Sequence, residues 1–350
     1  MQRLTLKGPL LVVAAVVVVF TGCGGDGSGG GNGGAGDDSG VLCDAGLPSQ
    51  ADAGAAASYD AGGTTVADAG GAGAGDAGAT PQKTTITVMT FNVLCSFCNS
   101  DYDPWDERLG YFSDILQRHA PDLAGLQELF TADEVSRILE LNPRYRAIYF
   151  HDDQERMLID YPDSTILYDR KRFKVLESGF YWLSETPDEP WSSGFAGGQI
   201  WRLVAWAHME QRADGREFYL AATHVDNNSP NQERSAPIIL ERTAPWADSL
   251  PVLVVGDFNS RPDSEAYRIL TTGDGVGFSL TDTFDIAGEW KVVTNQEPVP
   301  DYDTASRIDH IFVAGQAEWR CKQWVVDMYV YGAGNKYPSD HFPITAELEF

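Results

Sequence analysis

Six short segments of the sequence place an acid, an amide or a histidine where an apolar run stops. Taken singly, each segment has an ordinary structural explanation, since side chains such as Asn92 and Asp257 suit turns. Six such coincidences are harder to explain, because loops held by a rigid sheet are the usual place for catalytic groups. We therefore predict one polar site at the C-terminal ends of strands or in the loops after them. The segments are Phe91-Asn92-Val93, Leu126-Gln127-Glu128, Thr223-His224-Val225-Asp226, Gly256-Asp257-Phe258-Asn259, Arg307-Ile308-Asp309-His310 and Ser339-Asp340-His341-Phe342.

In this order, between residues 91 and 343, the segments resemble the endonuclease/exonuclease/phosphatase superfamily, which has the DNase-I-like fold. Residues 180–187, followed by Arg202 before Val204-Ala205-Trp206-Ala207, resemble a bacterial branch of metal-dependent hydrolases that is similar to deadenylase and nocturnin-type catalytic domains. The resemblance implies an α+β fold, a four-layer α/β/β/α sandwich of two packed mixed sheets flanked by helices.

The resemblance also implies a metal site. Attack on a phosphoester builds negative charge on phosphate and leaving oxygens, and a hard divalent ion held by carboxylates stabilises that charge. Glu128 would be the main Mg²⁺ ligand, with Asn92 beside it and Asp340 completing the cluster; Mn²⁺ is a possible substitute. Asp257 would orient or deprotonate the attacking water, and Asn259 would help to hold metal and phosphate.

Two imidazoles would contact the phosphate. His341 is expected to be oriented and charged by Asp309, because an acid–histidine pair favours the imidazolium form. His224 would be the second imidazole. The family usually supports this histidine with a Glu, but ungapped matching puts Pro162 there, so the adjacent Asp163 is the candidate replacement.

Two further residues are candidates for substrate or phosphate binding. Arg202 lies between apolar residues, where it would either contact phosphate or form a salt bridge at the edge of the core. Asp226 follows His224 by two positions and is expected to face the substrate.

Hydrophobic periodicity predicts the elements that would position these residues. A capping box at Thr131-Ala132-Asp133-Glu134 opens one predicted helix, and Asp214-Gly215 predicts a hairpin. Strands dominate, which favours two packed sheets. Helices are expected at residues 108–118, 131–139 and 234–242, and strands at 85–93, 122–127, 146–150, 164–168, 203–209, 217–223, 252–255, 307–313, 324–329 and 342–348.

The N-terminal part of the chain has a different composition. Arg3 and Lys7 precede an apolar run over residues 10–20 and then Thr21-Gly22-Cys23, which is typical of an export signal. A cysteine at this break resembles a bacterial lipobox, although Phe20 replaces the usual Leu; the alternative is an ordinary signal peptide. Residues 24–82 lack Lys, Arg and Glu and are rich in Gly, Ala and Asp, as expected of a flexible tether.

We therefore expect a lipoprotein signal peptide at 1–23 with Cys23 as the lipidation site, a disordered tether at 24–82 and a catalytic domain at 83–350. A lipid anchor would attach the exported protein to the cell envelope. Of the remaining cysteines, Cys43, Cys95, Cys98 and Cys321, one pair is expected to form a disulfide, but the sequence does not assign it. A zinc site has little support, because no second Cys or His pair has ligand spacing.

The charge of the chain limits the substrate. With 51 acidic and 25 basic side chains, the net charge of −26 disfavours sequence-independent binding to nucleic acid, which needs Lys and Arg on phosphates. We expect no stable nucleic-acid complex. The basic residues Arg170, Lys171, Arg172 and Lys174 would form either a solvated hairpin or a local basic groove.

The sequence thus predicts an exported, monomeric, Mg²⁺-dependent phosphoesterase that hydrolyses a phosphodiester or phosphomonoester by in-line attack of water. One alternative is a nuclease that acts on extracellular DNA or RNA. Another is an inactive surface-binding lipoprotein of the same fold. Loss of metal and water-activating residues would mark the inactive protein, yet Glu128, Asp257 and His341 are all present.

Overall fold

The computed structural model describes residues 84–99, 101–152, 157, 159–195 and 200–350. The predicted signal peptide, the lipidation site Cys23 and the tether lie outside the described residues. No helix in the described part of the chain is long and apolar enough to span a bilayer.

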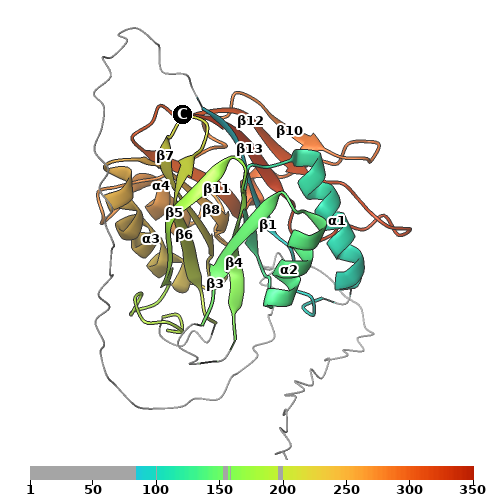
Figure 1. Cartoon of the computed structure of the whole chain (residues 1–350), viewed down its shortest axis with the longest axis horizontal. Coiled ribbons are helices and arrows are strands. Elements are labelled where there is room, and N and C mark those ends of the chain that lie inside the picture. The colour runs from blue at the N-terminus through green and yellow to red at the C-terminus, as the bar shows by residue number, and fades with distance from the viewer. Residues whose placement is uncertain (1–83, 100, 153–156, 158, 196–199) are drawn as a thin grey trace, which may run out of the picture. The chain divides into compact units, whose positions relative to one another are not determined.

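The described strands form two mixed sheets (Figure 1). Parallel pairs are β1 with β2 and β10 with β12 in the first sheet, and β7 with β8 in the second. The order in the first sheet is β10 (Trp290–Val293), β12 (Arg320–Asp327), β13 (Ile344–Glu349), β1 (Thr85–Asn92), β2 (Leu123–Gln127), β4 (Tyr161–Asp169) and β3 (Tyr145–Phe150). The order in the second is β5 (Phe173–Trp182), β6 (Leu203–Gln211), β7 (Glu217–His224), β8 (Pro251–Asp257), β11 (Asp309–Gly315) and β9 (Thr281–Asp282).

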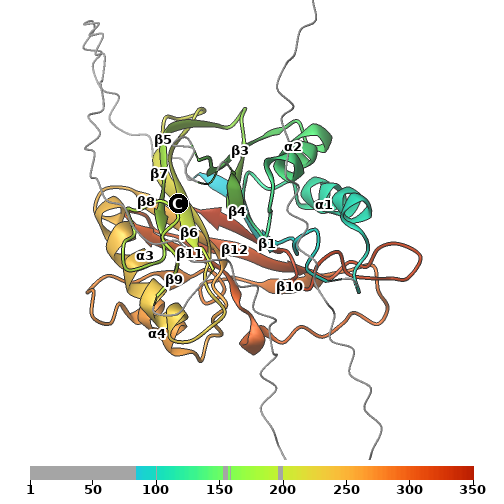
Figure 2. The same ribbon diagram turned by 90° about the horizontal axis from the view of Figure 1, so that it is seen from below.

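Helices cover the outer face of each sheet, as Figure 2 shows. The helices α1 (Trp105–His119) and α2 (Ala132–Leu141) pack on the first sheet through a cluster that includes Phe112 and Ile138. The helices α3 (Asn231–Ala247) and α4 (Glu265–Thr272) pack on the second sheet. A third cluster fills the space between the sheets. The four-layer α/β/β/α sandwich predicted from the sequence is confirmed.

Strand β8 shows how side-chain alternation builds these layers. Leu253 and Val255 belong to the cluster between the sheets, whereas Val252 and Val254 belong to the cluster under α3 and α4. Successive side chains of a strand point to opposite faces. A strand that is covered on both faces is therefore apolar throughout.

Several elements differ from the sequence prediction. The strands β5, β9 and β10, the helix α4 and the short 3₁₀ helix η1 (Thr304–Ser306) were not predicted. The hairpin interpretation of the basic run at 170–174 is wrong, because β4 pairs with β2 and β3, whereas β5 pairs with β6 in the other sheet. The run crosses between sheets, and Arg172 is held there by an ion pair with Asp122.

The parallel pairs explain why distant segments meet. The strands β1 and β2 end at Asn92 and Gln127, and β7 and β8 end at His224 and Asp257. Because the carboxyl ends of parallel strands share an edge, these residues lie at one edge of each sheet. The expectation that all six segments follow a strand is wrong for Asp309, which begins β11. It still reaches the same edge, because β11 is antiparallel to β8 and Asp309 pairs with Asp257.

Candidate active site

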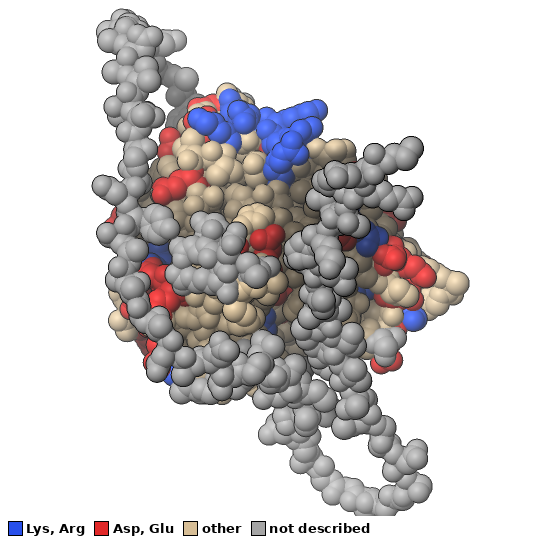
Figure 3. All heavy atoms as spheres, turned by 60° about the horizontal axis from the view of Figure 1, so that its bottom comes forward, with Lys and Arg blue, Asp and Glu red and all other residues tan. Residues whose placement is uncertain are grey.

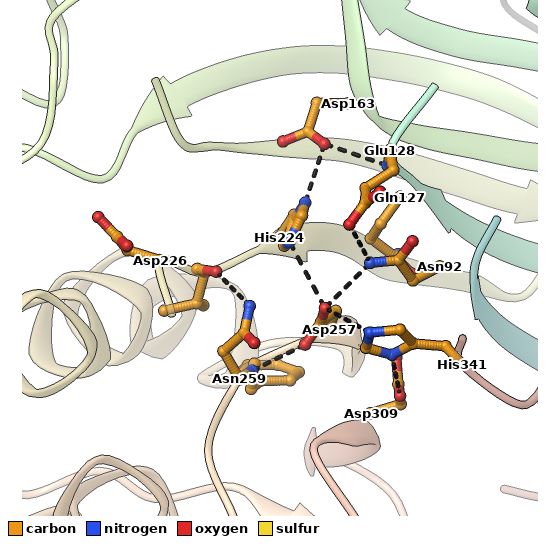
Figure 4. A network of polar contacts seen from close by, with 12 residues as sticks. Asn92, Gln127, Glu128, Asp163, His224, Asp226, Asp257, Asn259, Asp309 and His341 are labelled. Carbon is orange, nitrogen blue, oxygen red and sulfur yellow. Dashed lines mark hydrogen bonds and ion pairs between the residues drawn. The ribbon is translucent and has the colours of Figure 1, made fainter. Parts of the chain in front are cut away.

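Asp257 is the centre of the polar network at this edge (Figure 4). Asp257 is buried, and 1% of the residue is exposed to solvent. The Oδ2 atom lies 3.1 Å from Nδ2 of Asn92, 3.4 Å from Nε2 of His224 and 3.7 Å from Nε2 of His341. These three partners come from both sheets and from the loop before β13, so the site exists only where the two sheets meet.

The backbone around Asp257 allows this close approach. A Cβ atom on the preceding Gly256 would lie 2.1 Å from the carbonyl oxygen of Thr223 in β7, so only glycine fits. After Asp257, Asn259 has a positive φ of 49° and donates its backbone N–H to Oδ1 of Asp257 (2.8 Å). Positive φ is uncommon for a residue other than glycine and persists where the surroundings hold it.

Glu128 and Asn92 form the metal side of the site. Glu128 also has a positive φ, 65°, and is half-buried. Its Oε1 accepts a hydrogen bond from Nδ2 of Asn92 at 2.8 Å, and its Oε2 accepts one from the backbone N–H of Cys95 at 2.9 Å. Oδ1 of Asn92 accepts from the N–H of Leu94. Asn92 thus presents its amide nitrogen, and not its oxygen, to the carboxylates of Glu128 and Asp257.

The loop after β1 is closed by a disulfide between Cys95 and Cys98, which assigns the pairing that the sequence left open; Cys321 is free and buried. The sulfur atoms of Cys95 and Cys98 lie close to the carboxylate of Glu128. In the disulfide they are not thiolates, the form in which cysteine binds metals. We therefore assign the disulfide to holding the loop.

His224 is supported by Asp163, the residue that the sequence suggested as a replacement for the usual Glu. Nδ1 of His224 lies 2.9 Å from Oδ1 of Asp163, whose Oδ2 accepts from Arg202 at 3.1 Å. Burial alone would raise the pKa of Asp163, but the charges of His224 and Arg202 outweigh it and hold this pKa at about 2. Asp163 is therefore an anion that orients the His224 ring with Nε2 toward Asp257.

His341 is paired with Asp309, as the sequence predicted. Nδ1 of His341 lies 2.8 Å from Oδ2 of Asp309. Burial works against a charged imidazole, yet the carboxylates of Asp309 and Asp257 raise the pKa of His341 well above its usual value. His341 is consequently an imidazolium near neutral pH, with Nε2 aimed at the centre of the site.

The neighbouring His310 has another role, although it lies in the same sequence segment as Asp309. In β11 the side chains of Asp309 and His310 point to opposite faces. Ile311 belongs to the cluster between the sheets, whereas Phe312 belongs to the cluster under the helices. His310 lies on the face of Phe312, where Nδ1 contacts Asp282 and Nε2 contacts the carbonyl oxygen of Ser260.

Three predicted residues lie at the margin of the network. Arg202 forms the buried salt bridge with Asp163 that was one of its two predicted roles. The carboxylate of Asp226 points away from Asp257 (Figure 4) and accepts hydrogen bonds from Asn228 and Asn231. Neither contacts Asp257. Asn259 binds the carbonyl oxygen of Val225 through its side chain.

Asp340 precedes His341 in the loop before β13 and lines a cavity there. It is exposed as a residue, but desolvation of its carboxylate and the negative charge of Glu128 raise its pKa, against the opposing charge of His341. Two carboxylates that repel each other are a set that a divalent cation stabilises. By chemical type, the carboxylates of Glu128 and Asp340 are ligands that suit a hard divalent cation. Asp257, Asp309 and His341 offer a second group of ligand atoms, all within 4.8 Å of one another.

A cavity of about 300 Å³ opens beside His341. Its wall carries the acids Asp301, Asp303 and Asp340 together with the apolar or aromatic side chains of Tyr302, Met328 and Phe342. The sequence analysis did not identify this cavity, because its walls come from the loop at 301–308, the end of β12 and the loop before β13.

The comparisons with known proteins agree with this geometry. The model of the endonuclease/exonuclease/phosphatase family matches residues 89–341. No curated protein sequence matches the chain. Among solved structures, an endonuclease/exonuclease/phosphatase family protein from Bacteroides thetaiotaomicron is 28% identical, with a TM-score of 0.65 over 77% of this chain and 99% of its own.

Two other solved structures are informative. A mannosyl-6-phosphatase from Bacteroides thetaiotaomicron is 29% identical, with a TM-score of 0.64 over 76% of this chain and 100% of its own. The catalytic domain of human nocturnin, with a bound sulfate, is 19% identical, with a TM-score of 0.54 over 76% of this chain and 96% of its own. At that identity the likeness to nocturnin concerns the fold alone.

Proposed function

Because the chain belongs to the endonuclease/exonuclease/phosphatase family and is a phosphoester hydrolase, we propose that it is a Mg²⁺-dependent enzyme for small phosphoesters. The observation that carries this proposal is the convergence of Asn92, His224 and His341 on Asp257, with Glu128 beside them. These are the groups that hydrolysis by water requires: an anionic base, donors for the phosphate and a hard ligand for a cation.

Each side chain has a defined task in this mechanism. Asp257 accepts a hydrogen bond from the attacking water and receives its proton, while the N–H of Asn259 fixes the carboxylate. His341, charged by Asp309, donates from Nε2 to a phosphate oxygen as negative charge develops. His224 donates from the opposite side and is kept in place by Asp163. Mg²⁺, held by Glu128 and Asp340, would neutralise charge on the phosphate.

The size and charge of the surroundings favour a small substrate. The cavity beside His341 carries three exposed acids, two aromatic rings and Arg307, whose charge is paired with Asp282, and this balance disfavours a polyanionic chain. Figure 3 shows a face on which Lys and Arg gather at the upper margin, whereas Asp and Glu are scattered across it. The similarity to a mannosyl-6-phosphatase supports a phosphorylated sugar as the first substrate to test.

A substrate panel tests this proposal. We expect phosphate release from a hexose 6-phosphate or from p-nitrophenyl phosphate, and little cleavage of single-stranded DNA or RNA, each with Mg²⁺ and with EDTA. The Asp257→Asn variant is the control for contaminating activity. A higher kcat/KM for DNA or RNA would favour the nuclease alternative. Absence of hydrolysis with every substrate, including bis-p-nitrophenyl phosphate, would favour the inactive binding protein.

The metal role of Glu128 has its own test. Glu128→Gln should raise the Mg²⁺ concentration needed for half-maximal activity, by about tenfold or more, because a neutral amide is a poorer ligand for a hard cation. Glu134→Gln is a matched control, since Gln preserves the capping box that Glu134 forms with Thr131. An unchanged Mg²⁺ requirement in Glu128→Gln would contradict the metal role.

We further propose that the enzyme is exported, lipidated at Cys23 and attached to the cell envelope as a monomer. The apolar run that ends in Thr21-Gly22-Cys23 supports this proposal. Cys23→Ser should abolish signal processing and shift the protein from the membrane fraction to the soluble fraction. Unchanged processing and partitioning would exclude the lipobox.

A further inference from the structure

Arg108, in the first turns of α1, is a buried cation with an unusual set of partners. The residue is 2% exposed. A guanidinium has five N–H donors, and all five meet backbone carbonyl oxygens. Nε binds Asp103 at 3.0 Å, Nη1 binds Val93 at 2.6 Å and Pro338 at 3.2 Å, and Nη2 binds Leu94 and Cys95, each at 3.0 Å.

Three of these carbonyls belong to the loop that completes the metal side. This loop, at residues 93–98, follows Asn92 directly, and its Cys95 donates the backbone N–H that holds Oε2 of Glu128. Leu94 donates to Oδ1 of Asn92 and thereby sets the amide orientation. Arg108 therefore fixes the backbone on which both metal-side residues depend.

The carbonyl of Pro338 belongs to the loop that carries His341. We call this part of the site the phosphate side, because His341 is the proposed donor to the phosphate. Pro338 precedes Ser339, whose hydroxyl donates to the carbonyl oxygen of Asn92 and accepts from the N–H of His341. The loop at residues 338–341 thus carries Asp340 and His341 and is tied to the loop at 93–98 through Arg108 and Ser339. One side chain of α1 spans both halves of the site.

The charge of Arg108 is compensated without a direct salt bridge. Burial lowers its pKa, but the negative charges of Asp340 and Glu128 favour the charged form. The guanidinium also lies 5.4 Å from the ring centroid of Trp105 and 5.6 Å from that of Phe112, within cation–π range. A charged, planar and fully bonded group is stiff, because moving it would break several hydrogen bonds at once.

We propose that Arg108 is a positioning residue that couples the metal side and the phosphate side of the active site. Its guanidinium fixes the loops at 93–98 and 338–341 relative to each other, so that Glu128 and His341 act on the same phosphate. The consequence for metal binding rests on the function proposed above, whereas the coupling of the two loops does not.

Arg118 offers a matched control. It lies on the same helix but, unlike Arg108, pairs with a buried acid, Asp327, at 2.5 Å, and with the hydroxyl of Tyr331 at 2.9 Å. Its hydrogen bonds go to Asp327 and Tyr331, neither of which lies in the loop at 93–98 or in that at 338–341. Arg118 is half-buried, so its substitution reports the cost of losing a hydrogen-bonded arginine from α1 without loosening the site.

Arg108→Lys and Arg118→Lys test the proposal. Lysine keeps the charge but has three donors on one atom, so it cannot bridge five carbonyls. Hydrogen–deuterium exchange of the full-length proteins should become faster at 93–98 and 338–341 in Arg108→Lys and stay unchanged there in Arg118→Lys. Mn²⁺ affinity, measured by calorimetry without substrate, should fall about tenfold or more in Arg108→Lys alone.

The outcomes separate this proposal from the function on which part of it rests. Unchanged exchange in Arg108→Lys would overturn the coupling, whatever the activity. If the wild-type protein bound no metal and hydrolysed nothing while exchange at both loops rose in Arg108→Lys, the proposed function would fail and the coupling would stand. Faster exchange with unchanged Mn²⁺ affinity would remove the effect on the metal.

The Asp340→Asn variant supplies a second measurement if Arg108→Lys does not fold, because it removes the proposed metal ligand from the loop at 338–341. In this variant Mn²⁺ should still slow exchange in both loops together, because the remaining ligand Glu128 depends on one loop and Arg108 links it to the other. Slower exchange at 93–98 with no change at 338–341 would contradict the coupling.

Discussion

Two buried trios of aspartate, histidine and arginine share their aspartate–histidine and aspartate–arginine distances, although only Arg202 also contacts its histidine, at 2.7 Å from Nδ1 of His224. In the first, Asp163 lies 2.9 Å from Nδ1 of His224 and 3.1 Å from Arg202. In the second, Asp282 lies 2.9 Å from Nδ1 of His310 and 3.1 Å from Arg307. In both trios the aspartate pKa is about 2: burial opposes this shift, and the histidine and arginine produce it.

The trios differ in what the other imidazole nitrogen contacts. Nε2 of His224 lies 3.4 Å from Asp257 in the active site, whereas Nε2 of His310 lies 2.9 Å from the carbonyl oxygen of Ser260. The first ring can exchange its partner for a substrate, and the second has both nitrogens satisfied inside the protein. An Asp–His–Arg trio is thus a way to bury and orient an imidazole, and its surroundings decide whether it does chemistry.

The largest expected effect is on kcat, and it distinguishes His224 from His310. His224→Gln should lower kcat by about 10²-fold or more, the scale for loss of one preorganised donor. His310→Gln should leave kcat within about threefold of the wild type but lower the melting temperature, since buried partners lose a hydrogen bond. Turnover and thermal unfolding of both purified variants check this. Equal losses of kcat would show that the trios do not differ in function.

Acid should destabilise both trios to a similar extent. A depressed aspartate pKa contributes stability above the unfolded-state value, near 3.8, and that stability is lost as the pH falls toward the folded-state pKa. A shift to about 2 corresponds to about 2 kcal/mol for each buried aspartate. Urea unfolding between pH 5 and pH 2 measures this dependence.

The matched variants for this test are Asp163→Asn and Asp282→Asn. Each should be less stable at pH 5 and should show a weaker loss of stability toward pH 2 than the wild type. If only one variant changed the pH dependence, the electrostatic equivalence of the trios would be wrong.

The smallest expected effect concerns the pair of Asp309 and His341, which differs from both trios because it contains no arginine. Within the described residues no arginine contacts Asp309, and its Oδ1 has no hydrogen-bond partner. The raised pKa of His341 means that its donor form is lost only as the pH rises through that pKa. In Asp309→Asn this pKa should fall, so the alkaline limb of the kcat/KM profile should move about one unit lower.

The control for this prediction is Asp282→Asn, which changes an acid of the second trio and should leave the alkaline limb in place. An unmoved alkaline limb in Asp309→Asn would show that another group titrates there.

A double variant tests whether Asp309 and His341 act as one unit. The loss of kcat in His341→Ala combined with Asp309→Asn should be much smaller than the sum of the two single losses, because the effects of residues that act as one unit are not additive.

The sequence predicted most of the frame, because the patterns that carry it are local. Alternation and helical periodicity identified β1, β2, β7, β8 and α1, and the capping box at Thr131 is present as predicted. The strands β9 and β10 are short, with two and four residues, and β9 is defined by its pairing with β11. Such strands have no pattern of their own.

The chemical identities in the site were also present in the sequence, since the required residue types occur in a characteristic order. Their pairing follows from no local pattern, and the sequence pointed to Asp309 with His341 only through the family resemblance. Asp309-His310 and Asp340-His341 are both Asp-His dipeptides, yet Asp309 pairs with His341 and His310 pairs with Asp282. Asp309 and His310 are neighbours on β11 and point to opposite faces, so they cannot form a pair with each other, and each finds its partner on another element.

The sequence by itself determined which side chains the site contains and which layers the strands would form, because residue type and periodicity are properties of short segments. Only the tertiary structure decided that Cys95 pairs with Cys98 and that Arg108 binds two separate loops, and it established the contact between Asp163 and His224 that the family resemblance had suggested. The contacts of Asp163 and Arg108 join residues far apart in the chain. They arise where two sheets that pack face to face bring their strand ends and loops together, and no local pattern encodes such contacts.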